Sequence, residues 1–297
     1  MIDMSESAVT LFSPAKLNLF LEVKERRKDG FHELETVMLR TSFCDELKVA
    51  FTSGFEDRLT VTGDPKLADR VPTDESNLIR RAADAFREAT GLRTGCDIHL
   101  AKAIPMEAGL AGGSSNAATM LLALNHLADT PLEKHQLHQL AATLGSDINF
   151  FVEDCEAAVC TGRGEQVVSF SPASPIHFVV ARPKQGNATP AVFKNLQLPM
   201  EPNQRIGSAD AVEALKAGSV AALQEAMFNR LTESACQLNP DMADLMHRMS
   251  AVCERPAAMS GSGSTCFVCC KDHRDCAAVL EKVQALQPSF AMALQST

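Results

Sequence analysis

The sequence predicts an α+β fold built from two domains. The first half of the chain is rich in short segments whose apolar residues alternate as in strands, whereas the second half mixes such segments with longer stretches at helical spacing. A length of 297 residues is enough for one large domain or two medium ones with buried cores. Because the pattern changes near residues 160–175, we expect the domains to cover residues 1–165 and 166–297.

In the first half, alternation and turn signals predict strands at 17–23, 45–52, 59–62, 96–105 and 156–161. Helical spacing predicts helices at 76–89, 116–127 and 131–144. Ser76 is the expected N-cap of the first of these helices, and Gly91 is its expected end.

In the second half, strands are predicted at 176–181, at 265–270 and close to residue 297. Helices are predicted at 210–217, 220–228, 241–253 and 274–286. The Pro-, Asn- and Gln-rich segment 183–207 is predicted to be a loop.

The composition argues against several classes of protein. The formal net charge is −9, whereas proteins that coat nucleic acids are usually basic, so we expect no nucleic-acid partner; a small phosphorylated ligand needs only a local positive field. There is no apolar run of about 18 residues and no signal peptide in Met1–Thr10. The ten cysteines lie mostly in apolar runs. We therefore expect a reduced, cytoplasmic protein without membrane association, either a monomer or a homodimer.

A glycine-rich loop joins a predicted strand to a predicted helix. Glycine lets the backbone approach a ligand closely, the first N–H groups of the helix attract an anion, and two serines add hydroxyl donors. The loop has neither the Gly-Lys-Ser/Thr ending of a Walker A motif nor the spacing of G-x-G-x-x-G. It therefore predicts a phosphate site of another kind, and a flexible loop before a capped helix is the alternative. Its residues are Pro105, Met106, Glu107, Ala108, Gly109, Leu110, Ala111, Gly112, Gly113, Ser114 and Ser115.

Two polar side chains lie in the first predicted strand. Lys16 and Asn18 alternate with leucines, so they share one face of that strand. Such a face either presents both groups to a cleft or is an ordinary solvated surface, and the pattern leaves both interpretations open.

Asp147 follows the glycine that ends a predicted helix and precedes an apolar run. Its carboxylate either caps the following segment or takes the proton from an attacking hydroxyl. A nearby lysine would hold the carboxylate ionised and would stabilise the charge that develops on a transferring phosphoryl group.

Phe31 and His32 follow a turn at Asp29-Gly30. A flat ring beside a hydrogen-bonding imidazole suits a nucleobase, which would be bound by stacking and by contacts to its edge. A histidine with a purely structural role is the alternative.

Seven motifs, in this order, resemble the GHMP kinases and, within them, the 4-diphosphocytidyl-2-C-methyl-D-erythritol kinase family. They span nearly the whole chain, and the second motif distinguishes this family from mevalonate, homoserine and galactose kinases. The motifs are PAKLNL at 14–19, DGFH at 29–32, ESNLI at 75–79, the glycine-rich segment at 105–118, LGSD at 144–147, ATPAVF at 188–193 and MSGSGST at 259–265.

The resemblance implies a two-domain GHMP kinase fold. It has an N-terminal domain like that of ribosomal protein S5 and a ferredoxin-like C-terminal domain, with the active site in the cleft between them. It also implies phosphorylation of the 2-hydroxyl group of a cytidine-diphosphate substrate, 4-(cytidine 5'-diphospho)-2-C-methyl-D-erythritol, on the non-mevalonate route to isoprenoids. ATP and the cytidylated substrate would be the small-molecule partners. Mg²⁺ is expected with ATP, without assigned protein ligands.

The resemblance also implies a role for individual residues. Lys16 and Asp147 would form the catalytic pair, with Asp147 as the base. The loop 105–115 would hold the ATP phosphates, and the second glycine motif, Ser260 to Ser264, would close the site. The nucleotide and substrate contacts would come from Asn77, near the adenine, and from Asn18, Phe31, His32, Thr189 and Phe193, at the cytidine-diphosphate end.

The sequence departs from the family pattern at two places. Phe31 stands where the family usually has tyrosine, which keeps stacking but removes a hydroxyl contact. Glu107, Ala108 and Ala111 stand where the family has glycine. Alanine fits such a loop only where φ is negative, and Glu107 adds a negative charge near the expected phosphates.

Three other functions are consistent with parts of the sequence. A kinase for another sugar or alcohol would not need Phe31 and His32, and a non-catalytic nucleotide-binding relative would not need the Lys–Asp pair. A zinc protein is suggested by Cys266, Cys269, Cys270 and His273, but there is no second Cys-x-x-Cys, and buried core cysteines are the expected interpretation.

Overall fold

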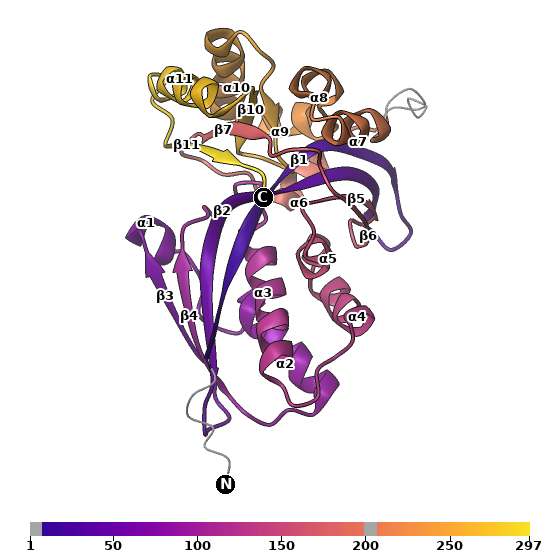
Figure 1. The fold of residues 1–297 in the computed structure, drawn as a ribbon, viewed down its shortest axis with the longest axis vertical. Coiled ribbons are helices and arrows are strands. Elements are labelled where there is room, and N and C mark those ends of the chain that lie inside the picture. The colour runs from indigo at the N-terminus through magenta and orange to yellow at the C-terminus, as the bar shows by residue number, and fades with distance from the viewer. Residues whose placement is uncertain (1–7, 199–206) are drawn as a thin grey trace. The chain divides into compact units, whose positions relative to one another are not determined.

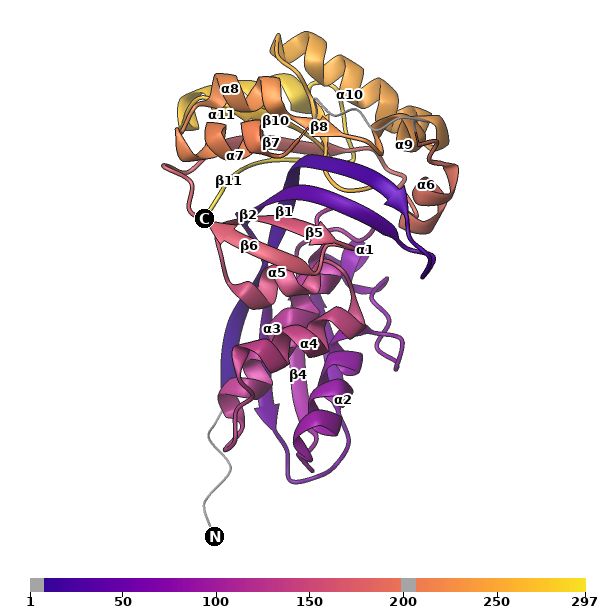
Figure 2. The ribbon, with the colours of Figure 1, turned by 90° about the vertical axis from the view of Figure 1, so that its right-hand side faces the viewer.

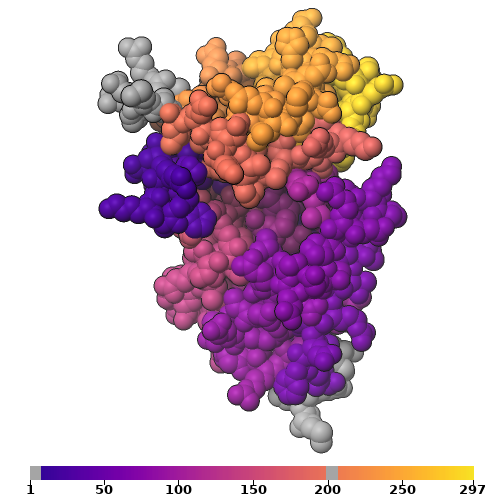
Figure 3. Space-filling model, turned by 180° about the vertical axis from the view of Figure 1, so that it is seen from behind, coloured from indigo at the N-terminus to yellow at the C-terminus, as the bar shows by residue number. Residues whose placement is uncertain are grey.

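The computed structural model describes residues 8–198 and 207–297; the other residues are grey in Figure 3. The described chain forms two compact units, each assembled from separate segments. Unit 1 comprises the chain up to Ala15 together with Phe43–Met106 and Ala111–Asp154, and unit 2 comprises Lys16–Ser42, Glu107–Leu110 and Cys155–Thr297. This interleaving does not test the predicted domain division between residues 165 and 166, which stays a prediction.

Two long strands, β1 (Ala8–Arg26) and β2 (His32–Phe51), are neighbours and contribute residues to both units. In unit 1, β2 pairs antiparallel with β4 (Cys96–Lys102), which pairs parallel with β3 (Arg58–Gly63). In unit 2, β2 pairs antiparallel with β5 (Ala157–Gly162), and β5 pairs with β6 (Gln166–Phe170). There β1 also pairs parallel with β8 (Phe228–Asn229).

All but the shortest of the helices of unit 1 lie on one side of its strands, as Figures 1 and 2 show. The central one, α3, follows the glycine-rich loop and is buried along most of its length, which explains why nearly all its positions are apolar or small. The helices are α1 (Pro65–Ala68), α2 (Leu78–Thr90), α3 (Gly112–Leu127), α4 (Lys134–Leu144) and α5 (Ile148–Glu153).

Unit 2 contains a second, antiparallel sheet in the order β11 (Phe290–Gln295), β7 (His177–Arg182), β10 (Cys266–Cys270) and β9 (Ala258–Met259). All five residues of β10 are buried, because helices contact this strand. The two long ones are α10 (Pro240–Cys253) and α11 (His273–Gln284). The shorter helices of unit 2 are α6 (Thr189–Asn195), α7 (Ala209–Lys216), α8 (Val220–Ala226) and α9 (Thr232–Leu238).

The structure confirms most predicted elements and corrects some of them. Strand β2 begins at His32 rather than near residue 45, and α6 lies within the segment predicted as loop 183–207, of which residues 199–206 are outside the described ranges. The predicted N-cap Ser76 is wrong. Asn77 caps α2 instead, its Oδ1 accepting a hydrogen bond from the N–H of Ile79 at 2.8 Å.

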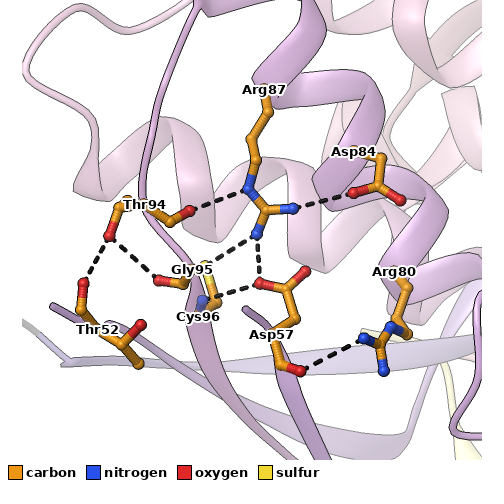
Figure 4. Close-up of polar contacts among 8 residues, drawn as sticks. All are labelled: Thr52, Asp57, Arg80, Asp84, Arg87, Thr94, Gly95 and Cys96. Atoms are coloured by element: carbon orange, nitrogen blue, oxygen red, sulfur yellow. Dashed lines mark hydrogen bonds and ion pairs between the residues drawn. The ribbon is translucent and has the colours of Figure 1, made fainter. Parts of the chain in front are cut away.

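A partly buried ion pair stabilises the part of unit 1 in which β4 begins (Figure 4). The Arg87 guanidinium of α2 pairs with Asp57, whose side chain is only 6% exposed. Asp57 also accepts a hydrogen bond from the N–H of Cys96 at 2.8 Å, and Arg87 donates to the carbonyl of Thr94 at 3.0 Å. The pair therefore joins α2 to the start of β4 and to the loop before β3.

The helices and the cysteines bear on the expectation of a reduced protein without membrane association. Within residues 8–198 and 207–297, no helix is both long and apolar enough to cross a membrane. The ten cysteines all fall inside these described ranges and form no disulfide bond.

Candidate active site

The side chains of Lys16 and Asn18 lie on one face of β1, as the alternation predicted. Lys16 Nζ donates to Asn18 Oδ1 and to the carbonyl oxygen of Gly109, the latter at 2.8 Å. Lys16 and Asn18 are each only 2% exposed, so the interpretation of this face as a solvated surface is wrong. Asn18 Nδ2 donates to Thr36 Oγ1 at 2.9 Å, which fixes the orientation of the Asn18 amide. The result is a buried ammonium group held in place by neighbouring oxygens.

The middle of the glycine-rich loop, Glu107–Leu110, belongs to unit 2 and packs on the second glycine motif. The Gly109 carbonyl accepts the Ser260 hydroxyl at 2.9 Å in addition to the Lys16 ammonium, and the Ala108 carbonyl accepts the N–H of Thr265 at 3.1 Å. Gly109 has φ +73°, and a Cβ there would collide with the Ser260 carbonyl oxygen. A glycine is therefore required at 109 by both conformation and contact.

The second glycine motif lies against the Lys16 ammonium. A Cβ at Gly261, whose φ is +56°, would lie 3.2 Å from Lys16 Nζ and 3.3 Å from Asn18 Oδ1. Asn229 Nδ2 donates to the carbonyl oxygens of Gly261 and Met259, each at 2.8 Å, and so holds this turn. Sequence reasoning missed Asn229, because it stands outside every motif.

Two rings predicted to bind a nucleobase lie together. His32 and Phe193 have ring centroids 5.1 Å apart and planes tilted by 32°. Burial, together with the charge of Arg26, lowers the pKa of His32 below its ordinary value. The imidazole is therefore neutral at pH 7 and offers one donor and one acceptor, which suits the polar edge of a base.

Phe31 is 50% exposed and lies under the guanidinium of Arg163, which is 4.9 Å from the ring centroid. Its N–H donates to Asp29 Oδ1 at 3.1 Å, which orders the turn before it. The cation–π contact covers one ring face with positive charge. Arg163 is a second residue that sequence reasoning did not single out.

Thr189 lies at the start of α6 and is tied to the second glycine motif. Its hydroxyl is 2.7 Å from the hydroxyl of Ser262. Asn187 Nδ2 donates to the Ser262 carbonyl at 2.9 Å, and Asn239 Nδ2 donates to Asn187 Oδ1 at 2.8 Å. Buried amides thus connect the predicted substrate residue to the turn that contacts Lys16.

The other end of the glycine-rich loop forms the start of α3 in unit 1. The helix begins at Gly112 rather than at the predicted Asn116, so the loop's last residues already lie in its first turn. The N–H groups of Gly112, Gly113 and Ser114 have no acceptor within the helix, whereas the N–H of Ser115 donates to the Ala111 carbonyl at 2.9 Å. The hydroxyl oxygen of Ser115 is buried and has no hydrogen-bond partner among the described residues. An unpaired hydroxyl at a helix N-terminus can donate a hydrogen bond to a phosphate oxygen, so these residues suit a nucleoside triphosphate.

The loop conformation corrects one expectation. Alanine was expected only at negative φ, but Ala111 has φ +57° and Glu107 has φ +52°. Both are in the left-handed region, where a residue with a Cβ costs about 1–2 kcal/mol. The loop therefore keeps the conformation that glycine would adopt without this cost.

Asn77 adjoins a surface pocket at the start of α2. The pocket has a volume of about 520 Å³ and is lined by Asp74, Glu75, Ser76 and Arg80. The Asn77 side chain is engaged in the local structure, since its Nδ2 donates to the Pro72 carbonyl at 2.6 Å while its Oδ1 caps the helix. Its predicted place near the adenine stays a prediction.

Asp147 occupies the N-cap position of α5 in unit 1, but its carboxylate makes no capping hydrogen bond. The alternative that Asp147 caps the following segment is therefore wrong. The start of α5 is held by other groups, because Asn149 Nδ2 donates to the carbonyl of His138 at 3.2 Å and the N–H of Ile148 points to the Gly145 carbonyl at 3.4 Å.

The cysteines that suggested zinc belong to the core. Cys266, Cys269 and Cys270 are fully buried in β10. Burial raises the pKa of both Cys266 and Cys269 to about 12, so these thiols remain protonated at neutral pH and are poor metal ligands.

Each unit thus brings together part of the predicted set. Unit 2 holds the ammonium of Lys16, the loop carbonyls, the ring pair and Thr189, whereas unit 1 holds the start of α3, Asn77 and Asp147. The predicted cleft and the pairing of Lys16 with Asp147 stay predictions.

Comparison with known proteins supports the same family. Residues 77–154 match the GHMP kinases N terminal domain, and residues 211–288 match the GHMP kinases C terminal family. A 4-diphosphocytidyl-2-C-methyl-D-erythritol kinase of Rhodococcus jostii is 36% identical over 275 residues, which are 92% of this chain and 87% of that protein. The enzyme of the same name from Protochlamydia amoebophila is 38% identical over 260 residues, or 88% of this chain and 84% of its own length.

Solved structures of GHMP kinases share the fold of this chain. A crystal structure of 4-(cytidine 5'-diphospho)-2C-methyl-D-erythritol kinase superposes with a TM-score of 0.79 at 33% identity, covering 97% of this chain and 100% of that one. A homoserine kinase from Cytophaga hutchinsonii, at 17% identity and a TM-score of 0.75 over 99% of this chain and 95% of its own, shares the fold. The predicted α+β fold with the two GHMP kinase regions is confirmed. The chain belongs to the 4-diphosphocytidyl-2-C-methyl-D-erythritol kinase family of the GHMP kinases.

Proposed function

We propose that this chain transfers the γ-phosphoryl group of ATP to the 2-hydroxyl group of 4-(cytidine 5'-diphospho)-2-C-methyl-D-erythritol, on the non-mevalonate route to isoprenoids. The observation that carries the choice of substrate is the pair of rings formed by His32 and Phe193, in the same unit as the Lys16 ammonium. An exposed ring face beside a neutral imidazole suits a pyrimidine base, and a kinase for a simple alcohol would not need such a pair. We propose a cytoplasmic enzyme that acts as a monomer or a homodimer.

The residues divide the work of the transfer. The 2-hydroxyl oxygen forms a bond to the γ-phosphorus while the bond from that phosphorus to the ADP oxygen breaks, and the hydroxyl proton passes to the carboxylate of Asp147. The Lys16 ammonium stabilises the negative charge that develops on the transferring group. Because Lys16 is already hydrogen-bonded to Asn18 and Gly109, it needs little reorganisation to act.

The loop and the start of α3 would hold ATP. The N–H groups of the first turn and the hydroxyl of Ser115, which has no hydrogen-bond partner among the described residues, would bind the triphosphate, and Asn77 would lie near the adenine. Mg²⁺, when bound with ATP, neutralises phosphate charge. Asn18 and Thr189 complete the contacts to the substrate's diphosphate end, with Phe31 beside the base.

The test is ADP release from Mg-ATP with four acceptors compared side by side: the cytidylated substrate, mevalonate, homoserine and galactose. The variant is Asp147→Asn, which keeps the size of the side chain but removes the base. The matched control is Asp154→Asn, since Asp154 lies at the opposite end of α5 and is exposed. We expect turnover with the cytidylated substrate alone, retained in the control and reduced by about 10²-fold or more in Asp147→Asn.

Each other outcome rejects a stated part of the proposal. Turnover with another alcohol would reject the assignment of His32 and Phe193 to a nucleobase. Equal activity of the two aspartate variants would reject Asp147 as the base. A folded protein that turns over none of the four would leave the non-catalytic relative as the better description.

A further inference from the structure

Asp45 is a fully buried carboxylate in β2 that connects the two ends of the glycine-rich loop within unit 1. Its Oδ2 accepts hydrogen bonds from Lys102 Nζ at 2.6 Å and from Asn116 Nδ2 at 2.9 Å. Its Oδ1 accepts the N–H groups of Ala103 and Ile104 at 2.7 and 2.8 Å. Three of these partners lie directly before the loop, whereas Asn116 lies in α3, directly after it.

Gly112, the first residue of α3, packs against Ile104 and Lys102, two of the residues that donate hydrogen bonds to Asp45. A Cβ at Gly112 would lie 2.9 Å from Ile104 Cγ2 and 3.2 Å from Lys102 Nζ. Between these anchored positions the chain leaves unit 1 after Met106 and returns at Ala111. The separation between the chain entering the loop and the helix leaving it is therefore set, inside unit 1, by groups that converge on one carboxylate.

We propose that Asp45 is a positioning residue for the nucleotide. It holds the start of α3, whose N–H groups face the phosphates, in register with the segment that enters the loop. The inference rests on the proposed use of ATP and concerns a residue that does not itself contact the ligand. The neighbouring Lys102 ammonium balances the carboxylate charge, so that the pair does not repel an anion at the helix start.

Positioning and charge predict opposite effects of the same substitution. Asp45→Asn keeps the shape and one acceptor oxygen, but it removes a negative charge and turns a donor toward Lys102 and Asn116. If Asp45 acted only through its charge, its loss would leave extra positive charge near the phosphates and would tighten nucleotide binding. If Asp45 positions the loop, the same change weakens binding.

The control is another ion pair of unit 1, Asp57 with Arg87, at the opposite end of β4; the Asp57 side chain is 6% exposed and that of Arg87 18% (Figure 4). Asp45 accepts a hydrogen bond from Ala103, directly after the last residue of β4. Asp57 accepts one from Cys96, the first residue of β4. Asp57→Asn therefore also removes a buried carboxylate from a pair, and it does so away from the loop. A purely structural role of Asp45 would make the two variants behave alike.

The experiment is calorimetric titration with a non-hydrolysable ATP analogue and Mg²⁺, without acceptor, alongside thermal unfolding. We expect the dissociation constant to rise by about tenfold or more in Asp45→Asn, and to stay at the wild-type value in Asp57→Asn although its melting temperature also falls. Asn116→Ala, which leaves the Asp45–Lys102 pair intact, should weaken binding several-fold. If Asp45→Asn does not fold, the affinity of Asn116→Ala decides whether this cluster of hydrogen bonds positions the nucleotide.

Wild-type or tighter affinity in folded Asp45→Asn would overturn the inference, and so would unchanged affinity in Asn116→Ala. An equal loss in Asp57→Asn would overturn it as well, because the effect would then follow stability. A wild-type protein that binds the analogue but does not phosphorylate the cytidylated substrate would reject the proposed function and leave this inference standing. No binding to the folded wild type would reject both.

Discussion

The ammonium of Lys16 donates a hydrogen bond to the carbonyl oxygen of Gly109, 2.8 Å away. The two residues are 93 positions apart in the sequence, yet both belong to unit 2. The contact fixes the cation against the glycine-rich loop. It follows that Lys16 is preorganised and that its removal should affect the chemical step more than the fold.

We expect Lys16→Met to reduce kcat by about 100-fold or more, because it removes the charge that would stabilise the transferring phosphoryl group. Methionine keeps the unbranched apolar stem, so the variant should remain folded. The control is Lys48→Met, since Lys48 is an exposed lysine of β2. Steady-state ADP release measures both variants. A kcat within twofold of wild type in Lys16→Met would contradict its catalytic role.

The ring pair predicts a selective effect on substrate binding. Phe193→Ala should raise KM for the cytidylated substrate by about tenfold, because one stacked base is worth about 1–3 kcal/mol, and should leave KM for ATP unchanged. Phe228→Ala is the control. It truncates another aromatic ring of unit 2, one that pairs with Phe20 at 5.8 Å. Equal changes in both KM values would argue against a role of Phe193 in binding the nucleobase.

The left-handed backbone at Ala111 predicts a stabilising substitution. Ala111→Gly should raise the free energy of unfolding by up to about 1 kcal/mol, because glycine adopts positive φ without the clash of a Cβ. Ala123→Gly, inside α3, the helix that Ala111 precedes as its N-cap residue, should instead lower it by about 1 kcal/mol or more, since it loses helix propensity and a buried methyl group. Urea unfolding measures both. The same sign for the two variants would refute the strain argument.

Glu35 predicts a pH-dependent contribution to stability. Burial opposes ionisation of this carboxyl, but hydrogen bonds from Lys24 and Ser208 outweigh it and lower its pKa from 4.5 to about 2. A group with a depressed pKa in the folded state stabilises the fold above its unfolded pKa, and this stability is lost as pH falls from about 4.5 to about 2.

At pH 7, Glu35→Gln should therefore lower the free energy of unfolding by about 1 kcal/mol, after allowance for solvent screening of the exposed Lys24. The difference from wild type should shrink as pH falls toward 2. Denaturant unfolding at several pH values, with Glu46→Gln as an exposed control on the same strand, measures this. A difference that does not depend on pH would show that the carboxylate charge is not involved.

Much of the candidate site was predictable because its signals are local. The glycine-rich loop before a helix and the alternation that sets Lys16 beside Asn18 depend on a few adjacent residues, and the structure confirms both local features. The phosphate site and the catalytic roles stay predictions. The N-cap of α2 was misassigned because Ser76 and Asn77 are both good caps, and only the backbone conformation separates them.

The parts that escaped prediction depend on distant partners. Asp45 forms its hydrogen bonds with groups 57 to 71 positions away in the sequence, and Asn229 with carbonyls about 30 positions away. The first half of β2 carries Glu33 and Glu35, which are unusual in a strand; ion pairs with Arg27 and Lys24 offset their charge. Pairings of this kind are set by topology and not by spacing in the sequence.

The interleaved segments also determine the order in which a growing chain can finish its parts. Every stretch of unit 1 has been synthesised once Asp154 is made. Unit 2 has to wait much longer, because β11 pairs with β7 and Ser296 bridges to Thr41. During translation the early strand residues 16–42 must therefore persist without their final partners. A pause after Asp154 would prolong this half-assembled state, and a premature stop there would release an aggregation-prone chain.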